Sequence, residues 1–261
     1  MSDVPILYEL DGGLACIILN RPQVLNSFTP EMLAALHAAV SRAGREARAV
    51  LITGAGRGFS AGQDLASIQA GYTETTSPDL KTLLEVSYHP MLADLRALPM
   101  PVVAAVNGVA AGAGLSLALA CDLRVAAENA RFATAFTRIG LVPDAGMGYT
   151  LPRLVGAGRA ASLLLTGEQV DAPTALSIGL VDKLMPAASF AEEARAYART
   201  LAEGPTRAFA LTKRMLQADG LSFSEMLTLE AELQAEAGNT ADHRGAIAAF
   251  LRKEPARFAG R

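Results

Sequence analysis

Residues 101–156 read PVVAAVNGVAAGAGLSLALACDLRVAAENARFATAFTRIGLVPDAGMGYTLPRLVG. The stretch begins with an uncharged run, Val102 to Val106, which is typical of a buried strand. A turn rich in glycine and alanine follows at 107–114, and residues 115–120 have the composition of a buried helix. The stretch therefore predicts a strand, a tight turn and a helix, as in a layered α/β domain.

Both ends of this stretch offer groups that could take part in chemistry. A turn of small residues lets backbone N–H groups at the start of a helix approach a ligand closely and stabilise negative charge. At the other end, Asp144 stands among turn residues and could transfer a proton. Each feature also has a purely structural explanation, because small residues pack tightly and an aspartate before a helix often caps it. The residues alone leave both explanations open.

The composition predicts a large hydrophobic core and excludes several classes of protein. The chain has 261 residues, of which 51% are hydrophobic and 19% charged, so it is near the upper limit for one core. A net charge of −3 without a long basic run argues against a nucleic-acid binder. We expect no membrane span and no signal peptide, because no apolar run is long enough and the N-terminus lacks a basic segment.

The cysteines and histidines argue against disulfides and metal sites. Cys16 and Cys121 stand in apolar stretches and are typical of reduced core residues in a cytosolic protein, so we expect a cytoplasmic location. The three histidines are scattered, and no cluster has metal-ligand spacing.

Local signals predict most of the elements along the chain. Thr29 followed by Pro30 marks a helix start, and a polar segment at 66–79 predicts a mobile loop in which Tyr72 could cover a site. The glycine-rich loop 54–62 lacks the lysine of a phosphate-binding loop. The predicted strands lie at 6–10, 14–20, 49–53, 102–106 and 123–126, and the predicted helices at 80–98, 112–120, 172–178, 189–203, 206–218, 222–237 and 241–251.

The C-terminal helices have more apolar residues than a monomeric helical cap needs. These residues are Leu227, Leu229, Leu233, Ile247, Phe250 and Leu251. They could cover the chain's own core or form an interface between copies, and the pattern leaves both readings open.

A series of short motifs, in this order and spacing, resembles the enoyl-CoA hydratase/isomerase (crotonase) superfamily over essentially the whole chain. The matching motifs are LNRP at 19–22 with LN at 25–26, GFSAGQDL at 58–65, VNG at 106–108 with GAG at 112–114, ACD at 120–122, GLVPD at 140–144 and LPRLVG at 151–156. Each motif alone is weak, but their combination is specific.

The resemblance implies an α/β spiral of β-β-α turns over residues 1–200 and a helical oligomerisation region over residues 201–261. It also implies a homotrimer, often paired into a hexamer, and a complex with another subunit of the family is an open possibility. The implied substrate is an acyl-CoA thioester. Since coenzyme A belongs to that substrate, no separate cofactor is implied.

The resemblance also assigns roles to individual positions. The backbone N–H groups of Gln63 and Ala113 would form an oxyanion hole for the thioester carbonyl, and Asp144 would be the acid and base. The implied substrate- and CoA-binding residues are Arg21, Ala61, Asp64, Leu65, Ser116 and Phe136.

The departures from the family pattern point to an isomerase. The two glutamates that the family's hydratases use fall on Ser116 and Phe136, and neither residue can activate water. One carboxylate, Asp144, suffices to move a double bond. The C-terminal run 242–251 and the segment 133–136 before Gly140 and Leu141 look most like the ring-epoxide isomerases of phenylacetate breakdown. A linear 3-enoyl-CoA and ring-1,2-epoxyphenylacetyl-CoA therefore both remain candidate substrates. A hydratase with another water-holding arrangement and a non-catalytic acyl-CoA-binding subunit are the alternatives.

Overall fold

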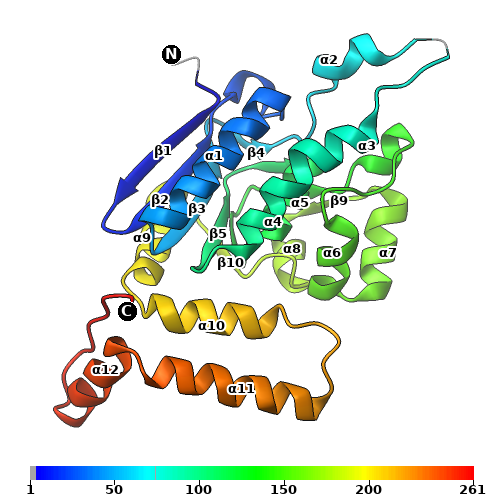
Figure 1. The fold of residues 1–261 in the computed structure, drawn as a ribbon. Coiled ribbons are helices and arrows are strands. Elements are labelled where there is room, and N and C mark those ends of the chain that lie inside the picture. Colours follow the sequence, from blue (N-terminus) through cyan, green and yellow to red (C-terminus); the bar gives the residue numbers. More distant parts are fainter. Residues whose placement is uncertain (1–3, 74) are drawn as a thin grey trace.

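A computed structural model describes residues 4–73 and 75–261 (Figure 1). The strands are β1 Ile6–Asp11, β2 Leu14–Leu19, β3 Ala49–Gly54, β4 Gly58–Ser60, β5 Val102–Val106, β6 Val109–Ala111, β7 Leu123–Ala127, β8 Arg131–Ala133, β9 Gln169–Asp171 and β10 Lys183–Met185. The α-helices are α1 Pro30–Glu46, α2 Leu65–Ile68, α3 Leu80–Leu83, α4 His89–Ala97, α5 Ala113–Ala120, α6 Met147–Val155, α7 Ala157–Thr166, α8 Ala172–Ser177, α9 Phe190–Ala202, α10 Thr206–Leu216, α11 Phe223–Gly238 and α12 Ala241–Leu251.

A six-stranded sheet forms the centre of the molecule. Its strand order is β1-β2-β3-β5-β7-β10, and every neighbouring pair except β1 and β2 is parallel. Alternate strand residues face opposite layers: Val103 and Ala105 pack towards α9, whereas Val102 and Ala104 belong to the larger core that α1, α4 and α5 complete. Because both faces are buried, the strands are apolar without interruption, which explains the run Val102–Val106.

A second sheet of short strands lies beside the first. Its order is β4-β6-β8-β9, with β4, β6 and β8 parallel and β9 antiparallel. The strands of the two sheets alternate along the chain, β3-β4, β5-β6 and β7-β8, and helical segments follow these pairs. This is the β-β-α repeat that the resemblance implied. Since β4, β6 and β8 are parallel, the segments that follow them meet at one edge of the sheet.

The expected helix at 80–98 is a single helical segment with a wider turn inside it. Residues 84–88 form a π-helical turn between α3 and α4, and the N–H of His89 donates to the carbonyl of Leu84, five residues earlier. The cause is Pro90 at the start of α4, because proline has no N–H to donate to the carbonyl four residues before it.

Most predicted elements are confirmed, and the departures concern the short elements. The segments 54–62 and 107–114 were expected to be loops and turns, yet they contain β4 and β6. The three-residue strands β8 and β9 were missed as well. The segment 66–79 is not uniformly loop, because the single helical turn α2 and the 3₁₀ turn at Gln69–Gly71 occupy its start.

Helices α10, α11 and α12 form a separate layer below the sheets, with α10 and α11 side by side (Figure 1). Arg48 joins this layer to the sheet region, because its guanidinium donates to Thr206 Oγ1 at 3.0 Å and to the carbonyl of Gly204 at 2.7 Å. The predicted boundary at residue 200 falls in the last turn of α9. Within the described part of the chain, no helix has both the length and the apolar character needed to cross a lipid bilayer.

Candidate functional site

A cavity of about 280 Å³ lies at the edge of the small sheet where β4, β6 and β8 end. Each of these strands is followed by residues of the cavity wall: Ala61 and Gln63 follow β4, Gly112 and Ala113 follow β6, and Phe136 follows β8. The rest of the wall comes from the α2, α3 and π-turn segments and from the segment 135–144. These residues are Leu65, Ile68, Leu80, Leu83, Leu84, Tyr88, Ala135, Arg138, Ile139, Leu141 and Asp144.

The backbone N–H of Gln63 is a free donor at this cavity. Residue 63 pairs with Phe28 in an isolated parallel bridge, in which the Phe28 N–H donates to Gly62 and the Asp64 N–H donates to Phe28. Peptide groups alternate in direction along an extended segment, so the N–H of Gln63 points away from Phe28. Among the residues that the structure describes, none accepts a hydrogen bond from it.

The backbone N–H of Ala113 is a second donor, and no acceptor for it lies in the described part of the chain. Ala113 is the first residue of α5, and the first N–H groups of a helix have no partner within the helix. The two donor segments touch, because a Cβ on Gly62 would lie 2.8 Å from the Ala111 carbonyl oxygen and 3.1 Å from the Ala113 nitrogen. Gly62 also has a φ of +92°, so only glycine fits this position without strain.

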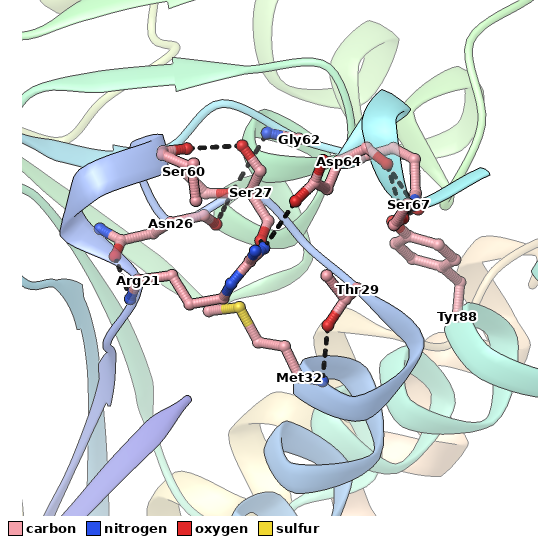
Figure 2. A network of polar contacts seen from close by, with 12 residues as sticks. Arg21, Asn26, Ser27, Thr29, Met32, Ser60, Gly62, Asp64, Ser67 and Tyr88 are labelled. Carbon is pink, nitrogen blue, oxygen red and sulfur yellow. Dashed lines mark hydrogen bonds and ion pairs between the residues drawn. The ribbon is translucent and has the colours of Figure 1, made fainter. Parts of the chain in front are cut away.

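A polar network fixes the segment that carries Gln63 (Figure 2). Ser60 Oγ donates to the Asn26 carbonyl at 2.8 Å and accepts from the Gly62 N–H at 3.2 Å. Arg21 lies on the other side, where its guanidinium donates to the Ser27 carbonyl and to Asp64 Oδ2 at 2.9 Å. Buried hydrogen bonds of this kind hold a loop in one conformation, so the donor at Gln63 is preorganised.

Asp144 places a carboxylate in the same cavity. Burial raises the pKa of this carboxyl to about 6. Its Oδ1 is buried and has no hydrogen-bond partner within the described chain. Asp144 is not the cap of the next helix, because α6 begins after Gly146 and no side chain caps it. The carboxylate is therefore available to a ligand.

Ser116 connects the start of α5 to the loop that carries Asp144. The residue is buried in α5, and its hydroxyl contacts the carbonyl of Asp144 at 3.0 Å and the carbonyl of Gly112 at 3.3 Å. The structure thus places Ser116 behind the cavity wall and not on it. Its position fixes the loop that carries Asp144 relative to the start of α5.

The other predicted site residues divide into two groups. Gln63, Ala61, Leu65, Phe136, Ala113 and Asp144 lie together on the cavity wall. Arg21 and Asp64 form an ion pair beside the cavity and are not part of its wall, so their contact with coenzyme A stays a prediction. Tyr72 is 46% exposed and lies away from the wall, whereas Tyr88 lies on it and was not expected.

The arrangement has the parts needed for enolate chemistry. Two fixed N–H donors can stabilise negative charge on one oxygen, and a carboxylate with a raised pKa can take up and return a proton near neutral pH. The wall is mostly apolar and suits an acyl group.

Comparisons with known proteins identify the family of the chain. The sequence profile described as enoyl-CoA hydratase/isomerase matches residues 9–261. A protein of Rhodobacter capsulatus named "probable enoyl-CoA hydratase" is 46% identical over 100% of both chains, and the 1,2-epoxyphenylacetyl-CoA isomerase of Escherichia coli is 41% identical over 98% of both. A crystal structure from Mycobacterium abscessus superposes with a TM-score of 0.94 at 40% identity, covering 98% of this chain and 100% of the other. The chain belongs to the enoyl-CoA hydratase/isomerase family and has its α/β crotonase fold.

Proposed function

We propose that this protein is an acyl-CoA isomerase that moves a double bond through a thioester enolate, with Asp144 as the only acid and base. The proposal rests on the number of carboxylates in the cavity wall. Among the described residues that line the cavity, Asp144 is the single carboxylate. A single carboxylate can shift a proton between two carbons, whereas water addition in this family uses two acids.

In the proposed reaction, the thioester carbonyl of a 3-enoyl-CoA accepts hydrogen bonds from the N–H groups of Gln63 and Ala113. Asp144 removes a proton from the carbon next to the carbonyl, and the electron pair spreads over a dienolate whose oxygen the two donors stabilise. The protonated Asp144 then returns the proton to the γ-carbon, which gives the 2-enoyl-CoA. Loss of one such donor typically costs about 3–4 kcal/mol of transition-state stabilisation.

Ring-1,2-epoxyphenylacetyl-CoA is the second proposed substrate of the same site. The name of the Escherichia coli relative, at 41% identity, supports this choice. Both substrates have a thioester carbonyl for the same two donors, so they differ only in the acyl group that the cavity holds. Conversion of the epoxide to the oxepin and of 3-hexenoyl-CoA to 2-hexenoyl-CoA should be compared on one preparation.

The alternative is a hydratase, which the name of the Rhodobacter capsulatus relative favours. A hydratase needs acids that hold and activate water, yet Ser116 is buried behind the wall and Phe136 presents an aromatic ring. We therefore expect hydration of crotonyl-CoA to be at least about a thousandfold slower than isomerisation of 3-hexenoyl-CoA, which corresponds to roughly 4 kcal/mol.

Both rates can be measured on one preparation, with 3-hydroxyacyl-CoA followed by mass and 2-enoyl-CoA by absorbance. Comparable rates would reject the isomerase proposal in favour of a hydratase. Binding of acyl-CoA without turnover of any of these thioesters would instead indicate a non-catalytic subunit.

A further inference from the structure

Tyr88 is a buried polar residue of the cavity wall that the proposed reaction does not use. Only 3% of the residue is exposed, and the π-helical turn that Pro90 causes places it opposite the segment carrying Gln63. Tyr88 points from its helix towards the segment that holds Asp64 and Ser67 (Figure 2). Burial and the neighbouring charge of Asp144 raise the pKa of the Tyr88 hydroxyl, so it stays protonated and can donate.

The hydroxyl of Tyr88 holds the side chain of Gln63. It donates to Gln63 Oε1 at 2.7 Å, and Gln63 Nε2 donates to Ser67 Oγ at 3.3 Å and to the Asp64 carbonyl at 3.4 Å. The Gln63 amide therefore links the π-helical turn to α2. Because both polar atoms of the Gln63 amide are held, the side chain restricts rotation of the backbone that carries it.

The ring of Tyr88 also acts on Gln63 indirectly, through Phe28. It packs edge-to-face on Phe28, with ring centroids 6.1 Å apart and an angle of 78° between the planes. Phe28 is the residue whose N–H and carbonyl bond to Gly62 and Asp64, on either side of Gln63. Tyr88 thus contacts both the side chain of Gln63 and the strand residue that aligns its backbone.

We infer that Tyr88 is a positioning residue for the oxyanion hole, which aims the Gln63 N–H at the thioester oxygen through the Gln63 side chain and Phe28. The inference rests on the oxyanion hole of the proposed function, but it holds for any reaction of a thioester at this site. The effect is indirect, since the single hydroxyl proton of Tyr88 is already donated to Gln63.

A spectroscopic experiment tests this role without any turnover. Binding of [1-¹³C]hexanoyl-CoA, a thioester that cannot isomerise, should lower the carbonyl stretching frequency in difference infrared spectra, because the two N–H donors polarise the bond. Tyr88→Phe keeps the ring on Phe28 and removes the hydroxyl, so it should reduce this shift. Tyr8→Phe is the matched control, since Tyr8 also donates a hydroxyl hydrogen bond, to Glu46 far from the site, and it should leave the shift unchanged.

Kinetics on 3-hexenoyl-CoA give the second arm of the test. Tyr88→Phe should lower kcat about tenfold with little change in KM, because a misplaced donor weakens transition-state binding more than ground-state binding. Gln63→Met should have a similar effect, and the double variant should be no worse than either single variant.

The outcomes separate the inference from the proposed function. If the wild-type protein lowers the carbonyl frequency but isomerises none of the thioesters, the isomerase proposal is rejected. The infrared spectra of Tyr88→Phe then still test the role of Tyr88. A full carbonyl shift in Tyr88→Phe, or losses that multiply in the double variant, would overturn the inference. If the wild-type protein itself gives no shift, both the assignment of the oxyanion hole and the inference about Tyr88 are rejected.

Discussion

Asp144 carries a carboxyl group that the fold keeps partly neutral near pH 6. Its pKa lies above the usual value of 3.8 because burial penalises the charged form. For an acid whose folded-state pKa is raised, the native state loses stability as the pH rises from the unfolded pKa to the folded pKa. We therefore expect the ionised Asp144 to destabilise the native protein above about pH 6 while it serves as the base.

The substitution Asp144→Asn tests both consequences. Isomerisation of 3-hexenoyl-CoA should fall by at least about a hundredfold, and wild-type kcat/KM should rise with pH around a midpoint near 6. In thermal unfolding, Asp144→Asn should be more stable than the wild type at pH 8, and the difference should vanish near pH 4. Near-normal turnover, or a stability difference that does not depend on pH, would contradict this assignment.

The sequence predicted the residues whose roles depend on local motifs and missed those that depend on packing. Gln63, Ala113 and Asp144 stand in short motifs, and the structure brings all three to one cavity. Tyr88 lies within a helix of ordinary amphipathic character. Pro90 two residues later is the only local sign of an irregular turn, and nothing in the sequence indicates that the turn faces Gln63.

At the scale of elements, the small sheet matters most for the site and was the hardest part to predict. β4, β6, β8 and β9 have three residues each, which is too short for a periodic pattern, and glycine-rich segments surround β4 and β6. The long elements were predicted well because their signals are strong. Helix α1, for example, begins at Pro30 with Thr29 accepting the N–H of Met32, as expected.

The contact between α5 and β4 gives an element-scale prediction. A Cβ on Gly114 would lie 2.4 Å from the Ser60 carbonyl oxygen, so Gly114→Ala must push the first turn of α5 away from β4. We expect a loss of about 1–3 kcal/mol in the free energy of unfolding and a larger fall in kcat than in substrate affinity, because the Ala113 N–H moves with that turn.

Denaturant unfolding and steady-state kinetics measure the two effects. Gly158→Ala in α7 is the matched control, because a Cβ there meets nothing within 4 Å. It should leave activity unchanged and alter stability by no more than about 1 kcal/mol. Full activity in Gly114→Ala would show that the start of α5 tolerates displacement and that the Ala113 N–H is not a required donor.

At the scale of the whole molecule, the C-terminal layer leaves large apolar side chains uncovered. Phe223 is 80% exposed, Phe250 78% and Leu251 76%. Apolar side chains gathered in one helical layer are typical of an interface between copies. We predict a trimer of about 82 kDa, three times the chain mass of 27.2 kDa, in light scattering at micromolar concentration.

The double substitution Phe250→Asp/Leu251→Asp tests whether this surface forms the interface. Both side chains are exposed in the single chain, so the change should cost little stability within a protomer, whereas two charges buried between copies should dissociate the trimer. Leu10→Asp is the control, because Leu10 in the edge strand β1 is also exposed, at 43%, and lies outside the C-terminal layer. A wild-type protein that scatters as a monomer would reject the trimer, and a trimer that survives the double substitution would place its interface on another surface.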